Sequence, residues 1–136
     1  MINPIADFLA MRRDIAARSK LIDLWGFFLN VPTLIGGLFF LYEPAGISVA
    51  AAIIVSLLIA IEIHKRRPLS RLTGFCHVVF LPVIALLAVE VWQGLAATAF
   101  GLWSVYCLVL MSVCVLLDAF DLFRYFVWDN QSYSKQ

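Results

Sequence analysis

Charged residues are scarce in this chain: they make up 14% of its 136 residues, while 63% of the residues are hydrophobic. An average soluble domain is about 25% charged and about half apolar. The mean hydropathy of +0.95 shows the same excess. The surplus apolar side chains must face something other than water, so the composition excludes an ordinary soluble globular domain.

Cysteine is also rare, and its placement excludes a disulfide framework. Cys76, Cys107 and Cys114 all lie inside apolar runs, and three is an odd number. Cys107 and Cys114 would lie two turns apart on one helix, about 10 Å, which is too far to bridge.

A cleavable secretory signal is not expected either. The first twenty residues mix acids with bases, and no A-x-A site follows the first apolar run.

The chain does contain four apolar stretches, each close to the length that can span a bilayer as a helix, which is about 20 residues. They fall at residues 21–42, 47–63, 72–92 and 95–117. We therefore predict an all-α integral membrane protein with a four-transmembrane-helix bundle over residues 21–117. Residues 1–20 form a cytoplasmic lead and residues 118–136 a cytoplasmic interfacial tail.

The lead has the pattern of a separate amphipathic helix. Asn3 and Pro4 match an N-cap followed by proline at the first helical position. Apolar residues recur at helical spacing from Ile5 to Ile15, with basic residues between them. This pattern favours a helix that lies on an anionic membrane surface. A plain extension of the first span is the alternative.

Basic residues occur on only one side of the predicted spans. The turns after the first and third spans contain none. The ten are Arg12, Arg13, Arg18, Lys20, Lys65, Arg66, Arg67, Arg71, Arg124 and Lys135. Positive residues in short loops stay cytoplasmic, so we predict a multi-pass protein of the cell (inner) membrane with both termini in the cytoplasm. The run Lys65–Arg67 then fixes topology and contacts anionic lipid, and we expect no nucleic-acid partner.

Polar and small residues inside the spans predict local packing. Pro32 should kink the first span, and Asn30 should bond the carbonyl that proline frees. Small residues recur on the second and fourth spans and predict helix-packing faces, either within the bundle or toward a partner. These faces are Ser48, Ala52, Ser56 and Ala60, and Ala97, Gly101 and Ser104.

The ionisable residues of the spans are predicted to gather near the cytoplasmic boundary. We expect them to form ion pairs at headgroup level that fix the packing of the helices. The set comprises Asp23, Glu62, Arg71, Asp118, Asp121 and Arg124. The middle of the bundle carries no charge, which argues against a proton relay or a charge-lined ion path.

A metal or haem site is a weaker alternative at the same boundary. Its candidate ligands are His64, Cys76, His77 and Asp118. Neighbours such as Cys76 and His77 diverge by about 100° on an α-helix, so the ligands would have to come from different spans. The pair His64 and His77 across the basic connection, joined by Asp118, could bind a metal, and the two histidines could bind haem.

No nucleophile–base pair, phosphate loop or metal motif of known spacing is present, so we expect no catalytic residue and no cofactor other than bound lipid. The sequence favours a non-catalytic accessory or organising subunit of a larger membrane complex, in contact with other membrane proteins or with copies of itself. A homo-oligomeric channel or small transporter is the alternative. A metal- or haem-binding protein, or a lipid enzyme at the cytoplasmic rim, is the third possibility.

Overall fold

The structure is a computed structural model that describes residues 3–94 and 97–128. Within these residues the chain forms five α-helices and one 3₁₀-helix, and no strand. The elements are α1 (Pro4–Arg18), α2 (Lys20–Phe39), α3 (Pro44–Arg66), the 3₁₀-helix η1 (Arg71–Val79), α4 (Phe80–Trp92) and α5 (Ala99–Val127).

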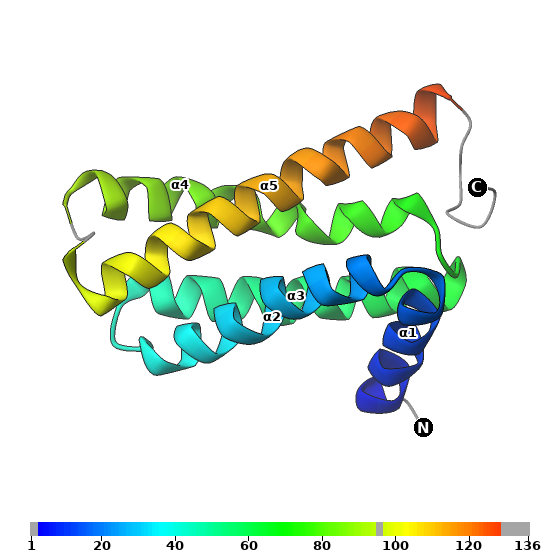
Figure 1. The fold of residues 1–136 in the computed structure, drawn as a ribbon, viewed down its shortest axis with the longest axis horizontal. Helices are drawn as coiled ribbons and strands as arrows, with labels where there is room; N and C mark the ends of the chain where they lie inside the picture. The colour runs from blue at the N-terminus through cyan, green and yellow to red at the C-terminus, as the bar shows by residue number, and fades with distance from the viewer. Residues whose placement is uncertain (1–2, 95–96, 129–136) are drawn as a thin grey trace.

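Four long apolar segments run up and down side by side (Figure 1). They are α2, α3, the continuous segment of η1 and α4, and α5. This arrangement confirms an all-α, multi-pass membrane bundle. The short helix α1 crosses the end of the bundle where α2 begins and α3 ends, and it packs against both (Figure 1).

The lead is a separate helix and not an extension of the first span. Ser19 interrupts the helical path with extended backbone (φ −155°, ψ 114°), and its hydroxyl accepts a bond from the Ile22 N–H at 3.4 Å. At the other end of α1, the Asn3 side chain accepts from the Ala6 N–H at 3.2 Å. Met11 is buried in a small cluster with residues of α3 and η1, while Leu9 remains exposed.

The bounds of the spans differ from the predicted ones by a few residues. The first span ends at Phe39 instead of residue 42, and the second extends beyond 47–63 at both ends. The fourth span, α5, begins at Ala99 instead of residue 95. Its N-cap is Thr98, whose hydroxyl accepts a hydrogen bond from the Gly101 N–H at 2.9 Å. The helix continues without a break to Val127, through the first part of the predicted tail. Residues 95–96 and 129–136 lie outside the described part.

The predicted hydrogen bond of Asn30 was wrong. Asn30 donates to the carbonyl of Gly26 at 2.7 Å, and not to the carbonyl that Pro32 frees. That carbonyl, on Phe28, accepts from the Tyr106 hydroxyl of α5 at 2.5 Å, so a neighbouring helix satisfies it.

The third span was expected to be α-helical throughout, but its first nine residues form the 3₁₀-helix η1. Runs of more than three or four residues in this form are uncommon. Pro82 gives a local reason, because it lacks the N–H that an α-helix would donate to the Val78 carbonyl.

The bundle core is apolar and closely packed. Leu29, Ile53, Phe80 and Met111 from the four spans meet in it. The helix α2 fits between two neighbours at a glycine pair. A Cβ on Gly37 would lie 3.1 Å from the backbone of α3, and a Cβ on Gly36 would lie 1.9 Å from the Trp103 ring of α5.

The predicted small-residue faces lie mostly inside this single chain. Ala52, Ser56 and Ala60 are buried on α3, and Gly101 and Ser104 are buried on α5. The two others differ: Ser48 is half-buried and donates to the Pro44 carbonyl, and Ala97 is exposed ahead of α5. Contacts within the monomer therefore account for most of both rows.

Candidate functional site

The charges of the described residues are divided unevenly between the two ends of the bundle. The nine described Lys and Arg residues lie on α1, at the start of α2, around the α3–η1 connection or near the end of α5. Figure 1 places these segments at one end, called here the basic end. Glu43 and Glu90 lie toward the other end. The asymmetry matches the predicted grouping of bases, and the assignment of the basic end to the cytoplasm stays a prediction.

Ion pairs fasten α1 to the bundle at the basic end. Arg12 donates to Asp23 of α2 through Nε and Nη2, at 3.0 and 2.8 Å. Asp14 meets the His64 Nε2 of α3 at 2.9 Å. A third pair joins Asp7 to Lys65 at 3.0 Å. The helix α1 is therefore tied to both α2 and α3 by charge as well as by apolar burial.

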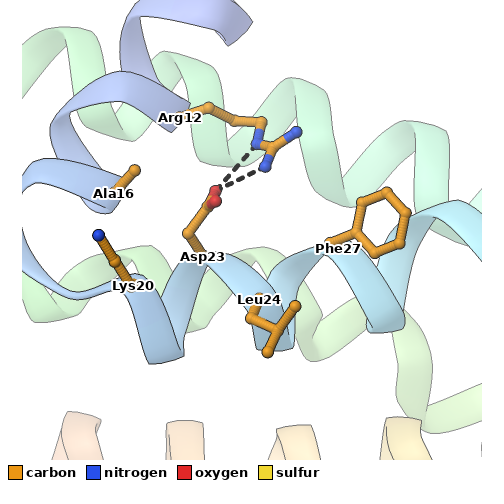
Figure 2. A pocket seen from close by; sticks show the side chains of 6 residues that line it. All are labelled: Arg12, Ala16, Lys20, Asp23, Leu24 and Phe27. Atoms are coloured by element: carbon orange, nitrogen blue, oxygen red, sulfur yellow. Dashed lines mark hydrogen bonds and ion pairs between the residues drawn. The ribbon is translucent and has the colours of Figure 1, made fainter.

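An open groove lies between α1 and α2 and is called here the α1–α2 groove (Figure 2). Its volume is about 620 Å³, within the range of about 300–1,000 Å³ that small-molecule sites occupy. Its lining residues are Arg12, Ala16, Lys20, Asp23, Leu24 and Phe27. An adjoining hollow shares three of these residues and adds Leu9 and Arg13.

The walls of the α1–α2 groove differ in chemistry along its length. Arg12 and Lys20 line the groove and Arg13 lines the adjoining hollow, so three positive charges lie near the single negative charge of Asp23. Further along α2, the exposed ring of Phe27 makes the wall apolar (Figure 2). The groove thus joins a basic end to an apolar end.

A second polar site lies where η1 meets α5, and we call it the η1–α5 seam. A 3₁₀-helix has 3.0 residues per turn, so residues three apart lie above one another. Arg71, Gly74 and His77 therefore share one face of η1. Gly74 allows α5 to approach, because a Cβ there would lie 3.1 Å from the Cβ of Asp118.

Polar pairs cross the η1–α5 seam in antiparallel order. Arg71, 1% exposed, pairs with Asp121. Next to this pair, Arg67 donates to the Tyr125 hydroxyl at 2.7 Å. Deeper in the bundle, His77 meets Asp118. The pairing of η1 with the polar face of α5 forms a row of contacts that leads from the basic end toward the core.

Three potential ligand atoms converge at the deep end of the seam. The His77 Nδ1 lies 2.5 Å from the Asp118 Oδ2 and 3.3 Å from the Cys114 Sγ. The Cys114 Sγ lies 3.7 Å from the same carboxylate oxygen. All three atoms lie within 4.8 Å of one another. Because thiol and carboxylate contact the same ring nitrogen, the set lacks the two-sided geometry of a Cys–His–Asp catalytic triad.

The structure distributes the residues predicted for a metal or haem site over separate clusters. His77 and Asp118 come together, whereas His64 pairs with Asp14 of α1. Cys76 packs with Met11 and residues of α3. The two histidines are thus engaged by different carboxylates.

The residues predicted to form rim ion pairs also find varied partners. Glu62 pairs with Arg66 at 2.7 Å on the exposed surface of α3. Arg71 and Asp121 pair with each other across the seam. The Arg124 guanidinium lies 5.7 Å from the centre of the Phe120 ring.

Sequence reasoning missed two important members of these sites. Cys114 precedes Asp118 by four residues, so the two had to share a helix face, and this spacing was a usable signal. Asp14 carried no such signal, because its contact with His64 depends on where α1 lies.

Comparison with protein-family models, with curated proteins and with solved structures gives no match for this chain.

Proposed function

We propose that the protein is a non-catalytic organising subunit of a membrane complex, and that it holds an anionic phospholipid in the α1–α2 groove. The observation that supports this proposal is the division of that groove into a basic part and an apolar part. Such a surface complements a lipid with a negative headgroup and apolar chains.

The proposed ligand follows from the charge balance. The phosphate would lie among Arg12, Arg13 and Lys20, while the acyl chains would follow Leu24 and Phe27 along α2. Among the described residues, Asp23 is the one acidic residue of the lining, and Arg12 already pairs with it. Lys20 and Arg13 then provide the surplus positive charge. A neutral headgroup such as phosphocholine offers no net charge to match it.

The interior of the bundle favours an organising role over transport. Away from the basic end, the buried polar residues among the described ones are Thr33, Ser56 and Ser104, and none of them carries a charge. The polar groups are concentrated at the basic end, where they join neighbouring helices. A tightly bound lipid at this end would stabilise the position of α1 and shape the surface that a protein partner meets.

The test compares lipid retention by the full chain and by a variant. The protein is released from nanodiscs of phosphatidylglycerol and phosphatidylcholine, and the bound lipids are identified by native mass spectrometry. In the double variant Arg13→Gln/Lys20→Gln, retention of phosphatidylglycerol should fall by about 30-fold. Each basic residue near an anionic surface contributes about 1 kcal/mol, and 2 kcal/mol corresponds to that factor.

The matched control is Arg66→Gln/Arg67→Gln, which removes two exposed charges from the same end but outside the groove. The run Lys65–Arg67 is expected to contact anionic lipid only as an exposed basic surface, so this variant should lose far less phosphatidylglycerol than the groove variant. Equal loss in both variants would mean that the lipid responds to the overall charge of this end. No enrichment of phosphatidylglycerol in the native protein would refute the lipid proposal.

A further inference from the structure

We propose that His77, Cys114 and Asp118 form a binding site for a transition-metal ion of the Zn²⁺ class. The proposal is independent of the lipid groove, because it depends on the η1–α5 seam alone. It adds Cys114, which the sequence did not single out as a ligand, to two residues that it did.

The donor set is the first argument. Imidazole nitrogen, thiolate sulfur and carboxylate oxygen are the three ligand types that proteins use for Zn²⁺. Here one of each type points to a common position from two adjacent helices. Hard cations such as Mg²⁺ or Ca²⁺ prefer oxygen ligands, so the sulfur and nitrogen donors select against them.

The distances between the donor atoms are the second argument. Tetrahedral Zn²⁺ bonds of about 2.0 Å to nitrogen or oxygen and about 2.3 Å to sulfur place ligand atoms about 3.3–3.5 Å apart. The Cys114 Sγ lies 3.3 Å from the His77 Nδ1 and 3.7 Å from the Asp118 Oδ2, close to these values. The third pair, His77 Nδ1 and Asp118 Oδ2, lies 2.5 Å apart and must open by about 0.8 Å. A small rotation of two side chains that are less than one-fifth exposed achieves this.

The surroundings are the third argument. Ligating side chains in metal sites are usually fixed by the groups around them. Gly74 leaves room for the Asp118 side chain, and the ring of Phe80 lies against the His77 ring with centroids 4.8 Å apart. Residues of η1, α4 and α5 therefore surround the site.

Binding requires deprotonated donor atoms. Cys114 binds as a thiolate, so its proton leaves to the solvent at the basic end. His77 binds through the lone pair of Nδ1, so the neutral ring must carry its proton on Nε2. Three protein ligands leave a fourth tetrahedral position for water or for another ligand.

Cobalt provides the test, because Co²⁺ occupies Zn²⁺ sites and absorbs light. The full chain is purified in detergent, freed of metal with a chelator and titrated with Co²⁺. We expect one equivalent to produce a near-ultraviolet thiolate charge-transfer band and visible bands of tetrahedral intensity. Added Zn²⁺ should remove both. In Cys114→Ser the charge-transfer band should be absent. Loss of a residue that only supports a ligand weakens metal binding by up to about 100-fold, so loss of the ligand itself should weaken Co²⁺ binding by at least about that factor.

The matched control is Cys107→Ser, which changes another buried cysteine two turns earlier on α5. It should keep the native spectrum. If Cys114→Ser does not elute as a monodisperse protein, His77→Gln takes its place, and it should lose the tetrahedral bands. An absence of cobalt bands in the native chain, or bands that persist in Cys114→Ser or His77→Gln, would overturn the proposal. The three side chains would then be joined by hydrogen bonds alone.

Discussion

Arg71 is the most deeply buried charged side chain among the residues that the structure describes. It is 1% exposed, and its partner Asp121 comes from a helix that begins 28 residues later in the chain. A buried charge is costly unless a partner compensates it. The pair therefore binds the start of the third span to the end of the fourth, in a way that exposed pairs such as Glu62–Arg66 cannot.

The substitution Asp121→Asn should destabilise the bundle by about 3 kcal/mol, because it removes the charge that faces a buried guanidinium. The measurement is the thermal unfolding midpoint in detergent, followed by circular dichroism. Glu62→Gln is the control, since its pair is exposed and should contribute about 0.5 kcal/mol or less. Equal effects of the two changes would show that the buried pair contributes little to stability.

At the scale of elements, the position of α2 depends on a close approach at Gly36. The Trp103 ring of α5 fills the space where a Cβ would be, and it also contacts the rings of Phe40 and Phe100. An indole held on several sides cannot move aside as a flexible side chain can. The contact between α2 and α5 thus depends on one missing methyl group.

Gly36→Ala should therefore lower the unfolding midpoint and separate α2 from α5. Gly26 is the matched control, because it lies on the same helix and a Cβ there meets nothing within 4 Å. Gly26→Ala should be neutral, or stabilising by up to about 1 kcal/mol, since alanine is the better helix former. Both variants can be compared by thermal unfolding and by tryptophan fluorescence. Tolerance of Gly36→Ala would mean that the indole repacks at low cost.

At the scale of the whole molecule, the unequal distribution of bases predicts that the basic end faces the cytoplasm. A cysteine introduced at Gln93, at the opposite end, should react with a membrane-impermeant maleimide in intact cells. A cysteine at Arg67 should react only after lysis. The three native cysteines are buried and provide a low background. The reverse labelling pattern would show that the chain is inserted in the other orientation.

The spans could be predicted from the sequence because a transmembrane helix is recognised by the hydropathy of about twenty residues together. One unusual residue in such a stretch changes the prediction little. Periodicity and capping indicated the bundle, but they left open whether the lead is a separate helix or an extension of the first span, and the structure shows a separate α1. The partners of individual side chains did not, because they depend on which helices touch. His64 meets Asp14 only because α1 folds back across α3, and the Phe28 carbonyl meets Tyr106 only because α5 packs beside Pro32.

The helix type of the third span was another feature that the sequence could not reveal. Proline at position 82 was visible, but a nine-residue 3₁₀-helix needs tertiary contacts to offset its weaker hydrogen bonds. The contacts of Arg71, Gly74 and His77 with α5 supply them. The same three-residue spacing in an α-helix would have turned His77 away from the face of Arg71.

The 3₁₀ form of η1 also sets how far the third span reaches. Nine residues at about 2.0 Å and thirteen at about 1.5 Å extend about 37 Å, whereas 22 α-helical residues would extend about 33 Å. The gain equals nearly one helical turn, added without a single extra residue. The extra length lies at the basic end, where Arg71 pairs with Asp121 of α5. The same 22 residues therefore span a thicker apolar layer than an unbroken α-helix of that length would.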